Sequence, residues 1–198
     1  LDGPESPKAR EFLSFIDRAA SKDRTLVLLG DLFYFYFESR RGIAPRFDWL
    51  VRALDSVAHK WAGIVLVRGN RDFLLGTTDT LPSSLLVAGD WLTVDMPGGK
   101  RLLVTHGDLL ITGDRLYRAF RAFMRSGFLR FFARELPVPL ACFCADSLRW
   151  VSFRRGGRDR YNPPDSAAAL SVLAASKADV IVIRSEEHTS ELQSRQSI

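Results

Sequence analysis

Three short apolar segments, each followed closely by a polar turn that contains glycine, limit the folds open to this sequence. Runs of this length, made almost entirely of apolar residues, are typical of strands that are buried on both faces of a sheet. Glycine lets the backbone turn sharply after such a strand. The segments are residues 25–29, 64–67 and 102–104, and the turns are Gly30-Asp31, Gly69-Asn70 and His106-Gly107-Asp108.

Helical patterns separate these strands. Ser6-Pro7 followed by an apolar stripe predicts a capped first helix. The alternation of helices and strands predicts an α/β domain in which helices cover the sheet or sheets. Further helices are expected at about 47–60 and 166–176, and further strands at 85–87, 91–94 and 180–183.

Composition indicates one ordinary globular domain, since 46% of the 198 residues are hydrophobic and 26% are charged. No apolar run reaches the length of about 18 residues that a membrane span needs, and the first residues do not resemble a signal peptide. Cys142 and Cys144 are too close for an ordinary disulfide and too few for a closed zinc site, so we expect core thiols in a reducing cytoplasm.

The chain is basic, with a formal net charge of +5, and arginine supplies 23 of its 28 cationic side chains. Arginine suits phosphate because its planar fork can donate two hydrogen bonds at once. A genome rich in arginine codons would produce the same bias, so the count alone does not choose between phosphate binding and codon usage.

The three polar turns carry the chemistry. The carboxyl edge of an α/β sheet is where ligands bind, so Asp31, Asn70 and His106 are expected to converge there. A carboxylate, an amide oxygen and an imidazole form a donor set suited to a divalent ion such as manganese. Two ions bridged by one carboxylate could clamp the attacking and leaving oxygens of a phosphoryl displacement.

In this order, the turns resemble the motif series of the calcineurin-like metallophosphoesterases. The third motif of that family is Gly-Asn-His-Asp. The matching turn of this chain reads Gly69-Asn70-Arg71-Asp72, with Arg71 where the general family has histidine. With the Phe-Leu-Leu-Gly that follows it, this motif resembles the UDP-2,3-diacylglucosamine hydrolases of lipid A biosynthesis. The resemblance implies a layered α/β/β/α sandwich over residues 1–183, with a helical lid insertion at about 114–160.

The resemblance also implies a reaction and roles for particular residues. Asp31 would bridge two divalent ions, expected to be Mn²⁺, and Asn70 and His106 would be further ligands. Asn70 and Arg71 would contact the substrate phosphate, and Asp114 the glucosamine part. The expected reaction is hydrolysis of the pyrophosphate of UDP-2,3-diacylglucosamine or a similar lipid-linked nucleotide sugar. Metal-bound water would be the nucleophile, and no side chain would be catalytic. The implied location is peripheral, on the cytoplasmic face of the inner membrane.

Residues 115–134 alternate arginine and aromatic side chains. If they formed one helix, Phe120, Phe123, Met124 and Phe131 would share a face. Such a segment could lie in a membrane interface, act as a lid over acyl chains, or pack its apolar face on the core. A second arginine group, between 149 and 160, gives no clear match to substrate-contacting residues.

Two other functions are compatible with the sequence. Arginines interleaved with aromatics could serve a phosphodiesterase that acts on nucleic acid or cyclic nucleotides. Arg71 and the aromatic lid argue against that, so nucleic acid is not the expected partner. A phosphoesterase-like binding protein without activity is the other alternative. The oligomeric state stays open.

The two ends of the chain differ from the resembled family. A strand ending in Asp-x-His is expected before Leu1, and Gly-His-x-His after Ile183. Residues 184–198 instead resemble a translated sequencing adapter, so we expect an artefactual tail, although a genuine polar tail is the alternative. With about half of the metal donors, this exact chain is expected to hydrolyse little substrate.

Overall fold

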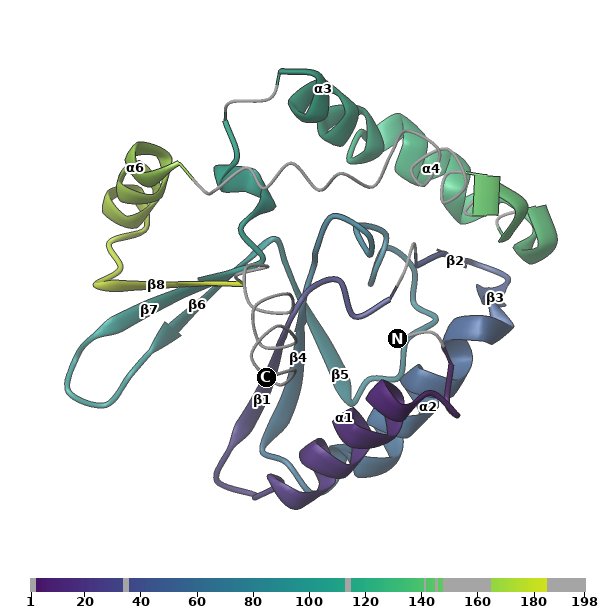
Figure 1. The fold of residues 1–198 in the computed structure, drawn as a ribbon, viewed down its shortest axis with the longest axis horizontal. Helices are drawn as coiled ribbons and strands as arrows, with labels where there is room; N and C mark the ends of the chain where they lie inside the picture. Colours follow the sequence, from purple (N-terminus) through teal and green to yellow (C-terminus); the bar gives the residue numbers. More distant parts are fainter. Residues whose placement is uncertain are drawn as a thin grey trace, which may run out of the picture.

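The computed structural model describes residues 3–33, 36–112, 115–140, 142–144, 146–147 and 165–184. Within them, helices and strands alternate as predicted, and the α/β fold class is confirmed (Figure 1). No helix in this described part of the chain is long and apolar enough to cross a membrane.

The first sheet is parallel and contains two of the three strands that end in polar turns. Its order is β1 (Thr25–Leu29), β4 (Gly63–Val67) and β5 (Leu85–Gly89). Leu29 pairs with Val67 in the parallel register, so the turns after β1 and β4 begin at the same level.

The second sheet holds the third such strand. It consists of β6 (Trp91–Asp95), β7 (Arg101–Thr105) and β8 (Val180–Ile183). β6 and β7 are antiparallel, whereas β7 and β8 are parallel, with Thr105 opposite Ile183.

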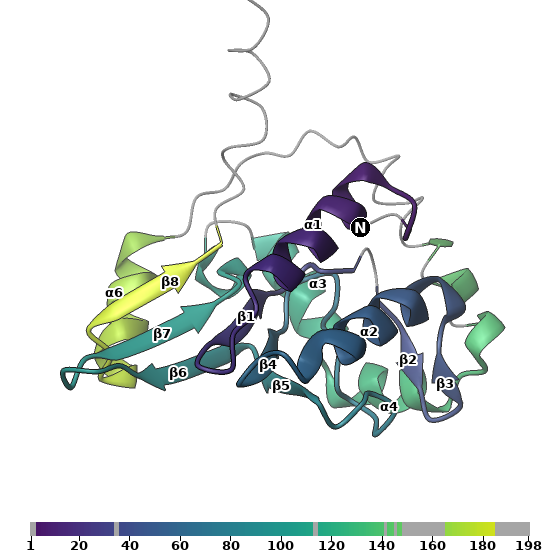
Figure 2. The ribbon, with the colours of Figure 1, turned by 90° about the horizontal axis from the view of Figure 1, so that it is seen from below.

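Helices cover the outer sides of the two sheets. Figures 1 and 2 show α1 (Pro7–Arg18) and α2 (Pro45–Ala58) beside the first sheet and α6 (Ser166–Ser176) beside the second. The side chain of Ser6 accepts a hydrogen bond from the backbone of Ala9, which confirms the predicted cap of α1. The main core joins α1 and α2 to the first sheet through Ile16, Leu50, Leu54, Ile64 and Leu66.

The basic aromatic stretch forms two helices rather than one. α3 (Arg115–Met124) and α4 (Gly127–Glu135) are separated at Arg125 and Ser126, and the Ser126 side chain caps α4 through the backbone of Leu129. The expected common face is therefore wrong, because a local cap interrupts the helical phase. Met124 is buried, whereas Phe123 and Phe131 are 57% and 64% exposed.

Three shorter elements complete the described structure. β2 (Glu38–Ser39) and β3 (Gly42–Ile43) form a small antiparallel hairpin that lies against α4, and a 3-10 turn (Asp108–Leu110) follows β7. Cys142 and Cys144 are free and partly buried, and Cys142 packs against the main core.

Candidate metal and phosphate site

The turns after β1 and β4 lie against each other at the carboxyl edge of the first sheet. Gly30 has a φ of +67°, and a Cβ added there would lie 2.6 Å from Cα of Gly69. Asp31, the next residue, also has a positive φ, of 50°. The two turns can approach this closely because neither glycine has a side chain.

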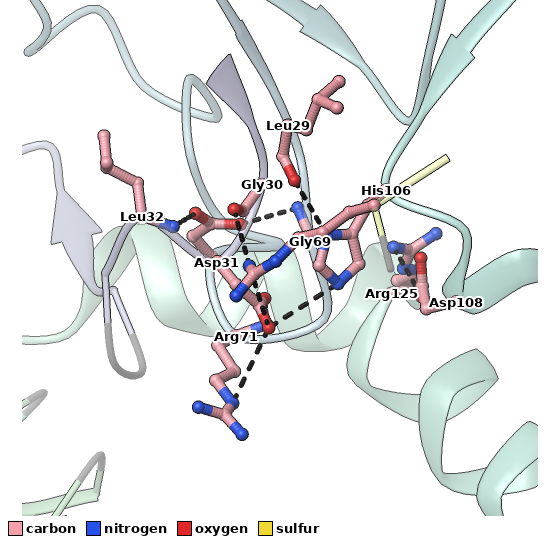
Figure 3. Close-up of polar contacts among 11 residues, drawn as sticks. Leu29, Gly30, Asp31, Leu32, Gly69, Arg71, His106, Asp108 and Arg125 are labelled. Carbon is pink, nitrogen blue, oxygen red and sulfur yellow. Dashed lines mark hydrogen bonds and ion pairs between the residues drawn. The ribbon is translucent and has the colours of Figure 1, made fainter. Parts of the chain in front are cut away.

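Two carboxylates hold these turns together reciprocally. Oδ1 of Asp31, in the first turn, accepts a hydrogen bond of 2.9 Å from the backbone of Arg71 in the second. Asp72, in the second turn, accepts bonds of 3.0 Å from the backbone of Leu32 and 2.6 Å from that of Gly69. Figure 3 shows Asp31 with Leu32, Gly69 and Arg71 around it.

Asp72 is fully buried. Burial, together with the nearby carboxylate of Asp31, raises the pKa of Asp72 to about 6, although its backbone hydrogen bonds act in the opposite direction. The edge of the sheet therefore concentrates negative charge in a place that water does not reach. A cation bound at this edge would relieve that repulsion.

His106, at the end of β7, joins the second sheet to this edge. Its Nδ1 lies 2.9 Å from the carbonyl oxygen of Leu29, the last residue of β1. Because a carbonyl only accepts, Nδ1 carries the proton, and in the neutral ring Nε2 is left with a free lone pair. Metal-binding histidines are commonly oriented by this kind of bond through the other ring nitrogen.

The lone pair of His106 faces the second oxygen of Asp31. Nε2 of His106 and Oδ2 of Asp31 are 3.5 Å apart, and both side chains are at most 5% exposed. Oδ2 is buried and has no hydrogen bond. Ligands that bind one ion at about 2.1 Å each can be at most about 4.2 Å apart, so this pair fits an ion held between them.

Two guanidinium groups lie near the same oxygen, Oδ2 of Asp31. Nε of Arg71 is 3.7 Å from Oδ2 of Asp31, and a terminal nitrogen of Arg184, the first residue of the expected artefactual tail, is 3.8 Å from it; both side chains are 39% exposed. These distances exceed those of a hydrogen bond. Arg71 is thus anchored by its backbone to Asp31 while its side chain can reach an anion from solvent.

The structure brings together most of the residues that the sequence selected. Asp31, His106 and Arg71 meet as described, and Asn70 lies between Gly69 and Arg71 in the second turn, with a buried side-chain oxygen. Within the described residues, however, His, Cys, Asp and Glu side chains do not form a group of three that could hold an ion. Asp31 and His106 supply two such donors and Asn70 an amide. Asp114 lies outside the described residues.

Three residues at this edge were not predicted to have a role. Asp72 holds the two turns together, and it could have been suspected from its place in the Gly69–Asp72 motif. Asp108 is buried, which raises its pKa, although Arg125 and His106 act in the opposite direction. Arg125 pairs with Asp108 at 3.1 Å, and nothing in its sequence context distinguishes it from its arginine neighbours.

An apolar cavity of about 400 Å³ opens beneath α4. Its wall is formed by α3, α4, the segment after the Gly69–Asp72 motif, the residues before β2 and four residues that follow α4. Apart from the hydroxyl groups of Tyr36 and Ser147, the thiol of Cys144 and the thioether of Met124, the side chains are hydrocarbon. The lining residues are Tyr36, Phe37, Phe73, Leu74, Phe123, Met124, Leu129, Phe132, Ala133, Leu136, Phe143, Cys144 and Ser147.

The fold and this edge define an α/β protein with a carboxylate and imidazole pair at the carboxyl ends of strands from two sheets. No family model matches the chain. Its sequence is similar to proteins named UDP-2,3-diacylglucosamine hydrolase. The protein from Pseudomonas aeruginosa (strain UCBPP-PA14) is 31% identical over 149 residues, which are 75% of this chain and 61% of the relative.

Two further relatives bear the same name. The protein from Neisseria meningitidis serogroup B is 31% identical over 134 residues, 68% of this chain and 55% of the relative. That from Actinobacillus succinogenes is 29% identical over 143 residues, 72% of this chain and 60% of the relative. The chain thus spans 55% to 61% of the length of these relatives. The resemblance read from the motifs is confirmed: the chain is a homologue of the UDP-2,3-diacylglucosamine hydrolases.

Proposed function

We propose that this protein hydrolyses the pyrophosphate of UDP-2,3-diacylglucosamine, or of a similar lipid-linked nucleotide sugar, in lipid A biosynthesis. The observation that carries the proposal is the buried pair of His106 Nε2 and Asp31 Oδ2, which are 3.5 Å apart. The names of the relatives supply the substrate class.

The donor set supports a metal centre, and we propose two divalent ions, Mn²⁺ in particular. Asp31 would bridge them, and Asn70 and His106 would be ligands. Bound divalent ions stabilise charge that develops on phosphate oxygens and lower the pKa of water. The hydrogen bond from His106 to Leu29 and the bond from Arg71 to Asp31 hold both donors in place before an ion binds.

Arg71 is the proposed phosphate-binding side chain, together with Asn70. Its backbone is fixed by Asp31, and its guanidinium is half exposed at the edge of the site, where it can donate two hydrogen bonds to a phosphate. A guanidinium keeps its charge at every physiological pH, so at this position it favours charge stabilisation over proton transfer. Asp114 is proposed to contact the glucosamine.

The apolar cavity supports the lipid part of the proposal. A site that binds acyl chains needs largely apolar walls, and the lining residues of this cavity provide them. We propose that residues 1–183 form the phosphoesterase domain, with a lid at about 114–160 that contains α3 and α4. Exposed phenylalanines of α4, among them Phe131, would then contact the cytoplasmic face of the inner membrane.

A panel of substrates tests the proposed function. The assay uses a chimera in which the Pseudomonas aeruginosa relative supplies the segments outside the matched region. With Mn²⁺, we expect release of UMP from UDP-2,3-diacylglucosamine and negligible turnover of oligonucleotides, cyclic nucleotides and simple phosphomonoesters. Turnover confined to the latter three would favour a different phosphodiesterase. Binding without turnover of any of them would favour an inactive binding protein.

Filling the cavity should select against long acyl chains. Leu129→Trp adds an indole to the cavity wall, and we expect kcat/KM of the chimera to fall about tenfold more for a long-chain substrate than for a short-chain analogue. Leu140→Trp, at an exposed residue that is absent from the lining, is the matched control. Equal losses on both substrates would show that the cavity does not hold acyl chains.

A further inference from the structure

Arg125 lies in the two-residue break between α3 and α4, and its side chain turns inward. The side chain is only 11% exposed although its neighbours on α4 include exposed phenylalanines. One terminal nitrogen is 3.0 Å from Oδ2 of Asp90, and the other is 3.1 Å from Oδ2 of Asp108. Figure 3 shows Arg125 beside Asp108, next to the strand end that carries His106.

The two carboxylates belong to different connections. Asp90 links β5 of the first sheet to β6 of the second, and its carbonyl oxygen accepts a hydrogen bond of 3.0 Å from Thr105 at the end of β7. Asp108 begins the 3-10 turn, two residues after His106. One guanidinium therefore joins the break in the α3 and α4 helices to the connection between the sheets and to the loop after His106.

Because these groups are buried, breaking their contact would cost free energy. The side chains of Asp108 and Asp90 are 3% and 26% exposed, so their charges are largely shielded from water. Removing the cation would leave two carboxylates close together without their common partner. Arg121 supplies a second link, since its guanidinium donates to the backbone carbonyl of Asp108. A lysine could not contact both carboxylates with a rigid fork.

We propose that Arg125 is a positioning residue. It fixes α3 and α4 relative to the strand ends, so that the distance between the apolar cavity and the site at Asp31 and His106 stays constant. A substrate with an acyl part and a phosphate part must occupy both places at once. The role of Arg125 is therefore to set the distance between the cavity and the site. The substrate in this proposal is that of the proposed function, on which the proposal rests. No contact of Arg125 with the substrate is required.

Hydrogen exchange on the 198-residue chain tests the anchor without any turnover. In Arg125→Gln, backbone amides of α4 and of residues 106–112 should exchange about tenfold faster, while those of β1 and β4 stay unchanged. Arg125→Lys should have an intermediate effect. Arg52→Gln removes an exposed ion pair with Asp48 on α2 and is the matched control. Exchange of α4 in Arg125→Gln equal to that of the control would overturn the proposal.

Kinetics of the chimera test the role in positioning. Arg125→Gln should raise KM about tenfold for the long-chain substrate with a smaller change for an analogue without acyl chains, and Asp90→Asn should act in the same direction. The double variant should lose less than the product of the two separate effects, because both remove one contact. Equal losses on both substrates would indicate a merely structural role and overturn the proposal. If the unsubstituted chimera hydrolyses neither, the proposed function fails, and the exchange data still decide whether Arg125 anchors the helices.

Discussion

Asp31→Asn should abolish manganese binding and, in the chimera, reduce kcat by more than about 100-fold, the upper range for residues that only support a metal ligand. The substitution is conservative in shape. Asparagine tolerates the positive φ of 50° at this position, and its oxygen can still accept from the backbone of Arg71. What it removes is the bridging charge beside His106, so the loss would report on metal binding rather than on misfolding.

The same substitution should stabilise the metal-free chain by about 1 kcal/mol, or roughly 2–4 °C in Tm. The carboxylate of Asp31 is buried and raises the pKa of Asp72. Its attractions to Arg71 and Arg184 act over 3.7 and 3.8 Å and involve half-exposed partners, so solvent weakens them. Repulsion and burial should therefore outweigh attraction.

Calorimetric titration with Mn²⁺ and thermal melting in chelator measure both effects. Asp17→Asn, which removes an exposed ion pair with Lys60, serves as the control and should leave metal binding unchanged. Undiminished manganese affinity in Asp31→Asn would place the metal somewhere else. A large fall in Tm without metal would show that Asp31 is a structural residue.

Gly30→Ala should strongly destabilise the fold. A Cβ there would lie 2.6 Å from both Cα and the backbone nitrogen of Gly69, and 2.9 Å from Nδ1 of His106. Backbone atoms of a buried turn cannot move aside as a flexible side chain does. The positive φ of +67° costs a further ~1 kcal/mol in alanine. We expect a total loss of about 3–5 kcal/mol in the free energy of unfolding.

Gly98→Ala separates the two causes. Gly98 has a similar φ, of +88°, but a Cβ there would meet no atom within 4 Å. Its cost in denaturant unfolding should therefore be about 1 kcal/mol, from backbone strain alone. Equal costs at the two glycines would mean that the turns after β1 and β4 are not in the close contact described.

The elements that depend on local sequence could be predicted. β1, β4 and β7 lie where continuous apolar runs place them. The expected burial on both faces is wrong for β1, whose residues are exposed or only partly buried, because it is the outer strand of the first sheet as described. The helix expected around 166–176 begins after Asp165, whose side chain accepts from two backbone groups of its first turn. The convergence of Asp31 and His106 followed from one general rule about strand ends.

Features that depend on contacts between distant residues could not be predicted. The hairpin of β2 and β3 has only two residues in each strand, too few for a pattern, and it is held against α4 by contacts such as that of Arg40 with Glu135. The break at Ser126 replaced an expected continuous helical face, because a serine inside a helical pattern can also cap a new helix. Nothing along the chain distinguishes Arg125 until Asp90 and Asp108 are placed beside it.

The most direct test of the central claim is NMR of the histidine side chains during titration with Mn²⁺, whose unpaired electrons broaden nearby signals. His59 is an internal control, because it is exposed at the end of α2, before β4 begins, and the five-residue strand separates it from the site by about 16 Å. We predict that substoichiometric Mn²⁺ broadens the imidazole signals of His106 and leaves those of His59 sharp, and that Asp31→Asn abolishes the difference. Signals of His106 that stay as sharp as those of His59 throughout the titration would contradict a metal site at this edge.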